Sequence, residues 1–121
     1  MILVDTSIWV AHLRKGNTRL VALLEINWVV IHPFIVGEIA CGSLADREMV
    51  LELLRQLPMA MAAESDEVLD YIERHRLHGK GIGYVDVHLL ASAMLGETKL
   101  WTRDKRLLEV AVELGCAIAD A

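Results

Sequence analysis

Only two cysteines occur among the 121 residues of this sequence. Cys41 and Cys116 are far apart, and neither belongs to a paired-cysteine motif. A disulfide framework is therefore not expected, and the simplest interpretation is two free thiols in a reducing, cytoplasmic setting. Because the cysteine and histidine spacing of a structural zinc site is also missing, we expect no zinc of that kind.

Long apolar runs and an excess of positive charge are missing as well. No apolar run approaches the roughly 20 residues that cross a bilayer, so we expect no membrane-spanning helix. The apolar residues 1–4 have no basic leader and are followed by Asp5, which argues against a secretory signal. The net charge of −5 argues against a globally basic surface for nucleic acid, although basic residues at 103–106 could act locally.

Apolar residues, in contrast, are abundant and make up 55% of the chain. Soluble domains contain about 45–50% on a similar count, so part of the surplus is expected to face a partner, and we predict a homodimer. The length suits one domain over residues 1–121. No internal repeat, low-complexity segment or linker interrupts it.

Short, branched apolar runs alternate with segments of helical spacing along the whole chain. The pattern predicts strands at 2–5, 28–31, 99–102 and 116–118, with a weaker one at 59–61. It predicts helices at 6–14, 17–24, from Pro33 through Glu38, and at 46–57, 65–78, 84–95 and 104–114. Thr6 or Ser7 is the expected cap of the first helix, and a flexible loop is expected at 79–83. Such alternation indicates a parallel sheet sandwiched between helices.

Four acidic residues differ from the others in their surroundings: Asp5, Glu38, Asp86 and Asp104. None has a lysine or arginine three or four positions away, whereas Asp70 has Arg74 one helical turn on. An ionised carboxylate that faces apolar surroundings costs several kcal/mol unless a positive charge meets it. We therefore expect these four side chains to share a cation.

The chemistry of that cation follows from the donor atoms. Carboxylate oxygens suit a hard ion such as Mg²⁺ or Mn²⁺. Two such charges about 4 Å apart repel by roughly 4 kcal/mol at an effective dielectric near 20, so converging acids need protonation or a metal. Ligands of parallel sheets bind beyond the carboxyl ends of the strands, which is where Asp5 and Asp104 are expected. A metal placed there can activate water for attack on a phosphodiester.

The ordered motifs Val4-Asp5-Thr6-Ser7, Glu38 in a helix, Gly83-Tyr84-Val85-Asp86 and Thr102-Arg103-Asp104 span nearly the whole chain. Together they resemble the PIN domain, and in particular the VapC-type toxins of toxin–antitoxin pairs. The resemblance implies a PIN-like three-layer α/β/α sandwich around a central, mainly parallel sheet of four to five short strands. It also implies an Mg²⁺- or Mn²⁺-dependent endoribonuclease that acts on RNA and is inhibited by a cognate antitoxin protein.

The same resemblance assigns roles to individual residues. Asp5, Glu38, Asp86 and Asp104 match the family's catalytic, metal-binding acids. Thr6, Ser7 and Thr102 match small hydroxyl residues beside those acids, and with Arg103 they are the expected substrate-binding residues. In one departure, Lys105-Arg106-Leu107 stands where many relatives have a further acid, so one or two metal ions remain possible.

Simpler interpretations stay open for several of these residues. Without any role in metal binding, Asp104 could serve as a helix cap and Asp86 as an acid favoured in the first turn of a helix. Asp5 could in the same way serve as an acceptor of hydrogen bonds from a turn. Arg103 could meet phosphate or be a solvated residue. His88 points to another face than Asp86 and is expected to be a packing or surface residue rather than a metal ligand. The tryptophans are expected in the core: Trp9, Trp28 and Trp101.

Two other functions compete with a nuclease. A receiver-type phospho-aspartate domain has a similar length and an acidic metal pocket, but it would need adjacent acids after the first strand, where this chain has Asp5 alone. A catalytically silent PIN-like binding module would need no complete set of acids, and this chain has all four.

Overall fold

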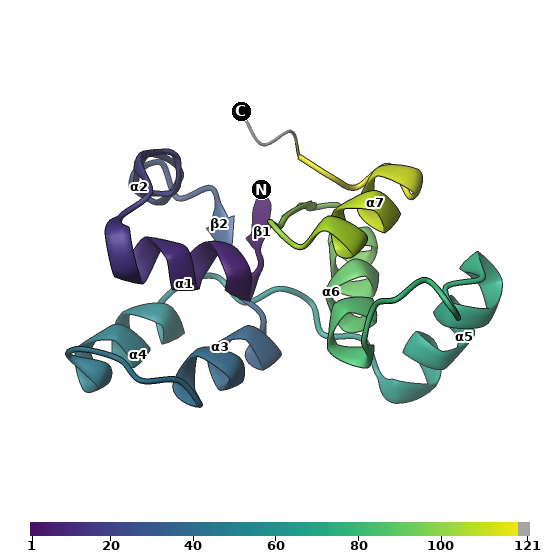
Figure 1. The fold of residues 1–121 in the computed structure, drawn as a ribbon, viewed down its shortest axis with the longest axis horizontal. Coiled ribbons are helices and arrows are strands. Elements are labelled where there is room, and N and C mark those ends of the chain that lie inside the picture. Colours follow the sequence, from purple (N-terminus) through teal and green to yellow (C-terminus); the bar gives the residue numbers. More distant parts are fainter. Residues whose placement is uncertain (119–121) are drawn as a thin grey trace.

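A computed structural model describes residues 1–118 of the chain. Its strands are β1 (Ile2–Val4), β2 (Val29–Val30) and β3 (Lys99–Trp101). Its helices are α1 (Thr6–Lys15), α2 (Thr18–Glu25), α3 (Pro33–Ala40), α4 (Arg47–Arg55), α5 (Ser65–His75), α6 (Tyr84–Leu95) and α7 (Lys105–Glu113). The elements follow the predicted order (Figure 1).

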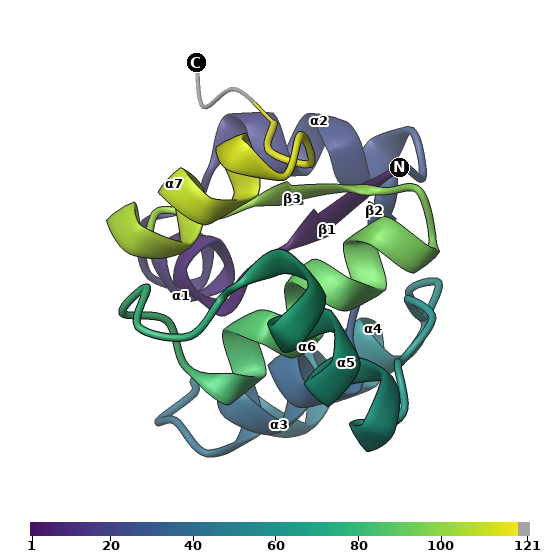
Figure 2. The same cartoon turned by 90° about the vertical axis from the view of Figure 1, so that its right-hand side faces the viewer.

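The sheet is parallel, in the order β2-β1-β3. β1 occupies the centre, with Leu3 opposite Val30 on one side and Leu100 on the other. Leu3 and Leu100 are fully buried, as expected of a strand that is covered on both faces. Figure 2 shows α2 and α7 above the sheet and α6, α5 and α3 below it, which confirms the predicted layers of helices around a parallel sheet.

The sheet is narrower than the predicted four to five strands, because three strands are present within residues 1–118. The two segments predicted as further strands each make a single parallel bridge, Ile31 to Met59 and Leu100 to Ala117. At the first edge, Pro58 supplies a carbonyl to the Ile31 N–H but has no N–H of its own to extend the ladder.

Three local expectations were wrong. Asp5, and not Thr6 or Ser7, caps α1, because the strand passes into the helix without a loop. Helix α5 ends at His75, since Arg76 adopts a left-handed conformation with φ of 53°. Trp28 is 46% exposed at the start of β2, whereas Trp9 and Trp101 are buried as predicted.

Both cysteines are free thiols, as predicted. Cys116 is buried, and burial raises the pKa of its thiol. No helix within the described residues is long and apolar enough to cross a membrane.

Candidate active site

The carboxyl ends of β1 and β3 bring two of the predicted acids to one edge of the sheet. Val4 pairs with Trp101, and the Asp5 N–H donates to the Trp101 carbonyl at 2.9 Å. The register therefore continues one residue past the strands and places Asp5 beside Thr102. Asp104 follows two residues later, at the start of α7.

Asp5 is only 6% exposed and accepts three hydrogen bonds. Its Oδ1 atom receives the Thr6 N–H at 2.7 Å. Its Oδ2 atom receives the hydroxyls of Ser7 at 2.8 Å and Thr102 at 2.7 Å. These donors fix the orientation of the carboxylate at the strand end.

The hydroxyls of Thr102 and Ser7 extend this network toward α7. Thr102 Oγ1 accepts the Asp104 N–H at 3.0 Å, and Ser7 Oγ accepts the Arg103 N–H at 3.1 Å. Each hydroxyl thus donates to Asp5 and accepts from the backbone of the segment after β3. The side chains expected to contact substrate therefore hold the acidic residues in place.

Glu38 joins the same network from α3. Thr6 Oγ1 donates to Glu38 Oε1 at 2.7 Å, although the two residues are 32 positions apart in sequence. Thr6 directly follows Asp5, so the bond fixes the distance between α3 and the end of β1. Glu38 itself is exposed and lies in the last turn of α3.

Asp104 caps a helix and also lies near another of the predicted acids, Asp86. Its Oδ1 atom accepts the Leu107 N–H at 3.0 Å, which is the N-cap bond of α7. Its backbone N–H binds Thr102, the residue that also holds Asp5. The cap therefore does not remove Asp104 from the cluster.

Asp86 lies in the first turn of α6 and is half-buried. Burial is the largest cause that raises the pKa of its carboxyl, and a hydrogen bond from the Gly83 N–H, at 3.2 Å, opposes this. The negative charges of Asp5, Asp104 and Glu38 raise the pKa of Asp86 further. The other three carboxylates are thus each close enough to Asp86 to repel its negative charge.

The donor set fits a hard divalent ion, because it consists of carboxylates and hydroxyls. Within residues 1–118, however, no three histidine, cysteine or acidic side chains already form a compact metal site. Each of the four carboxylates is turned toward a neighbouring N–H or hydroxyl. A carboxylate has about four lone-pair directions, so these bonds leave capacity for a cation.

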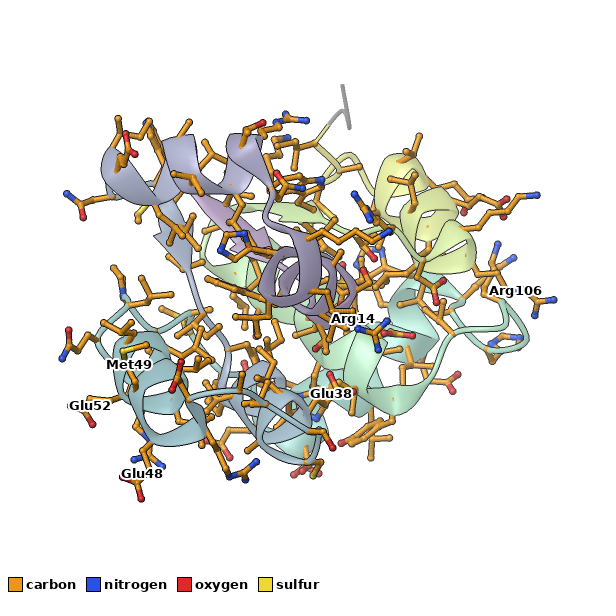
Figure 3. The ribbon with its side chains drawn as sticks, turned by 60° about the vertical axis from the view of Figure 1, so that its left-hand side comes forward. Arg14, Glu38, Glu48, Met49, Glu52 and Arg106 are labelled. Atoms are coloured by element: carbon orange, nitrogen blue, oxygen red, sulfur yellow. The ribbon has the colours of Figure 1, made fainter. Side chains whose placement is uncertain are left out.

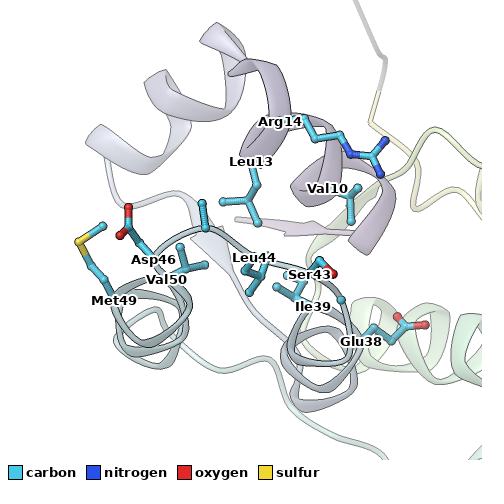
Figure 4. Close-up of a pocket in the computed structure, with 12 residues that line it drawn as sticks. Val10, Leu13, Arg14, Glu38, Ile39, Ser43, Leu44, Asp46, Met49 and Val50 are labelled. Atoms are coloured by element: carbon cyan, nitrogen blue, oxygen red, sulfur yellow. The ribbon is translucent and has the colours of Figure 1, made fainter.

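A pocket with a volume of about 340 Å³ extends from Glu38 between α1 and the segment that joins α3 to α4. Apolar side chains form much of its wall: Val10, Ile39, Leu44 and Val50. Figure 4 shows Glu38 at one end and Arg14 on the opposite helix, and Figure 3 shows both side chains in the same region of the surface. The acidic cluster is therefore continuous with an apolar groove.

The structure also contains an aromatic cluster on the helices of Glu38 and Asp86, which the sequence analysis did not predict. Phe34 and Tyr84 lie on α3 and α6, the helices that carry Glu38 and Asp86, and both rings contact His88. The spacing of four between Phe34 and Glu38 was the available signal, because it places both on one helix face. His88 is buried, so of the two roles expected for it the structure shows the packing one.

The family model described as the PIN domain matches residues 2–113. Over 121 residues the chain is 47% identical to Ribonuclease VapC32 of Mycobacterium tuberculosis, in both strain CDC 1551 / Oshkosh and strain ATCC 25618 / H37Rv, covering 99% of this chain and 98% of each relative. The chain therefore belongs to the PIN-domain family, as a VapC-type member.

Two solved structures share the fold. The crystal structure of FitAcB from Neisseria gonorrhoeae aligns with a TM-score of 0.64 and 23% identity over 99% of this chain and 97% of that chain. The structure of FitAB bound to an IR36 DNA fragment aligns with a TM-score of 0.60 and 21% identity over 93% and 91% of the two chains.

Proposed function

We propose that this protein is a VapC-type toxin, an endoribonuclease that hydrolyses RNA phosphodiester bonds with Mg²⁺ or Mn²⁺ held by Asp5, Glu38, Asp86 and Asp104. The observation that carries the proposal is the connected cluster of acids. Thr6 donates its hydroxyl to Glu38 and its N–H to Asp5, and the Thr102 hydroxyl joins Asp5 to the backbone N–H of Asp104. The charges of these three acids all raise the pKa of Asp86. The 47% identity to a ribonuclease over nearly the full length supports the same activity.

The acids have different roles in this proposal. Asp5 and Asp86 are the direct metal ligands, because they are the more buried pair. Glu38 and Asp104 are exposed and either bind the ion through water or orient the attacking water. When bound, the ion supplies charge that polarises a phosphoryl oxygen and lowers the pKa of a coordinated water. Glu38 Oε1 is held by Thr6, so Oε2 is the atom that would accept a water proton.

Arg103 is the proposed phosphate contact. It is exposed, and its backbone N–H is fixed to Ser7 at the edge of the acidic cluster. The positive charge of the Arg103 side chain would offset the repulsion between the acids and the RNA backbone. Replacing Arg103 with Ala should weaken RNA binding and reduce its dependence on salt, and unchanged affinity across a salt series would exclude this contact.

Two protein partners belong to the proposal. A cognate antitoxin would insert a segment over the apolar groove that ends at Glu38 and place a basic side chain among the acids, which suits the charge of the site. A second copy of the chain would cover part of the exposed apolar surface. Light scattering after size-exclusion chromatography tests the homodimer, and a monomer at high micromolar concentration would contradict it. We further propose that the protein acts in the cytoplasm.

The deciding experiment compares RNA cleavage by the wild-type protein and by Asp5→Asn. An Asn side chain keeps an oxygen for the Thr6 N–H and can donate to Ser7 and Thr102, so the fold should persist. We expect metal-dependent cleavage by the wild type only, and sequencing of the RNA ends would identify the sites. Cleavage at the wild-type rate by Asp5→Asn would contradict the assignment. Specific RNA binding without cleavage by the wild type would favour a silent binding module.

A further inference from the structure

Two exposed aromatic rings lie on α3 and α6, the helices that carry Glu38 and Asp86. Phe34, in the first turn of α3, is 39% exposed, and Tyr84, the first residue of α6, is 47% exposed. Phe34 precedes Glu38 by about one helical turn on the same face. Tyr84 lies two residues before Asp86 and four before His88, and so shares a face of α6 with His88, whose ring Phe34 also contacts. The helices that position two of the acids therefore also position two accessible rings.

Both rings are anchored on one buried side chain. The centroid of the His88 ring lies 4.7 Å from that of Phe34 and 4.6 Å from that of Tyr84, the latter pair at 90°. Phe34 also contacts the buried His32 ring, with centroids 5.1 Å apart. These edge-to-face contacts hold each ring on its inner side and leave its outer surface open. The rings are thus ordered before any ligand arrives.

The electrostatics of the site make such rings useful to a nuclease. The chain carries a net charge of −5, and four carboxylates lie where the scissile phosphate must bind. Contacts to phosphate alone would supply little affinity in this field, whereas base stacking is insensitive to charge and tolerates every base. Four helical residues, a rise of about 6 Å, separate Phe34 from Glu38, so a base on this ring would belong to a nucleotide beside the scissile bond.

From these observations we infer that Phe34 and Tyr84 form a stacking platform for a nucleobase of single-stranded RNA next to the cleaved phosphate. The inference rests on the proposed ribonuclease function and adds to it a binding site for a base. A duplex keeps its bases stacked on one another, so the platform selects single-stranded segments, loops and ends.

The test measures RNA binding by anisotropy in the Asp5→Asn background, so that the RNA stays intact. The probes are a short, labelled single-stranded RNA of mixed sequence and an abasic ribose-phosphate strand of equal length. With Phe34 and Tyr84 intact, the protein should bind the RNA that has bases about tenfold or more tightly than the abasic strand. Phe34→Leu keeps apolar bulk against His88 but removes the aromatic face, and Tyr84→Leu does the same on α6.

Each leucine variant should lose most of the preference for bases while its affinity for the abasic strand stays unchanged. Phe34→Tyr and Tyr84→Phe keep a ring and should keep the preference. Trp28→Ala is the matched control, because Trp28 is equally exposed but precedes β2 at the opposite end of the strands. Thermal unfolding verifies that each variant is folded.

Several outcomes would overturn the platform. A preference for bases that persists in both leucine variants excludes it, as does an equal loss in Trp28→Ala. If the leucine variants instead dissociate a dimer and bind both probes normally, the rings form a protein interface. The proposed ribonuclease function is tested separately by wild-type cleavage in Mg²⁺ or Mn²⁺, so the platform can fail while that function stands; absence of cleavage overturns both.

Discussion

Thr102 donates its hydroxyl to Oδ2 of Asp5 at 2.7 Å, joining the ends of β3 and β1 across 97 positions of sequence. Thr102 is 1% exposed, and its Oγ1 also receives the Asp104 N–H. One buried hydroxyl therefore sets the positions of two of the acids. This bond is the structural centre of the site.

Replacing Thr102 with Val tests that role, since valine has nearly the same shape but no hydroxyl. The change leaves the Asp5 carboxylate with one donor fewer and the Asp104 N–H without its acceptor. We expect the free energy of unfolding to fall by about 1–3 kcal/mol and the cleavage rate to fall with it. Thr102→Ser should restore both quantities. Urea unfolding and initial cleavage rates measure them, and a valine variant equal to wild type would contradict the role.

Thr6→Val separates catalysis from stability, because within residues 1–118 the Thr6 hydroxyl donates to the exposed side chain of Glu38. We expect the unfolding free energy to change by no more than about 0.5 kcal/mol, as is usual for surface positions. The value of kcat should fall several-fold while KM changes little, since Glu38 loses its orientation. Recovery in Thr6→Ser is the control. A fall in stability without a fall in kcat would show that the bond is merely structural.

Asp86→Asn should stabilise the metal-free protein. The change removes a charge that the other three acids repel, and the amide oxygen can still accept the Gly83 N–H. We expect an increase of about 1 kcal/mol in the free energy of unfolding together with loss of activity. Asp70→Asn is the control with the same change in net charge, because Asp70 pairs with Arg74 on the exposed face of α5. Equal responses of the two variants would argue against repulsion in the cluster.

His32 predicts a pH dependence of stability. The side chain is 1% exposed, its Nδ1 accepts the Phe34 N–H, and burial followed by the nearby His88 charge lowers the pKa of His32 to about 4. Its ordinary pKa is 6.5, so the unfolded chain binds this proton first as the pH falls. Stability from His32 is therefore complete above pH 6.5 and is lost toward pH 4, by at most about 3 kcal/mol.

His32→Asn is the matched variant for that prediction, because asparagine also caps a helix but does not titrate. Urea unfolding at several pH values should show a shallower loss of stability for the variant between pH 6.5 and 4. Identical slopes for the two proteins would show that His32 is not protonated on unfolding in this window.

Much of the fold could be predicted because its signals are local. Short branched runs mark β1 and β3, and the absence of a basic neighbour marks Asp5, Glu38 and Asp86. The width of the sheet depends on how far further segments pair with its edges, and the segments at Met59 and Ala117 each make a single bridge. Local patterns do not report how far such pairing continues.

The hydrogen bonds of the site could not be predicted in the same way. Thr6, Ser7 and Thr102 were placed beside the acids, but the bonds to Glu38 and Asp5 depend on how α3 and β3 pack against the start of α1. The exposure of Trp28 has the same origin, since the burial of a ring depends on which elements pack over it. Tertiary packing sets these features, and sequence spacing does not.

Calorimetric titration of Mn²⁺ into the purified metal-free protein tests the central claim most directly. The account predicts saturable binding of Mn²⁺ by the wild type and unchanged binding by Asp70→Asn. Asp5→Asn and Asp86→Asn should bind the ion at least about tenfold more weakly than the wild type. No uptake by the wild type, or equal uptake by all four proteins, would show that these carboxylates do not form a metal site.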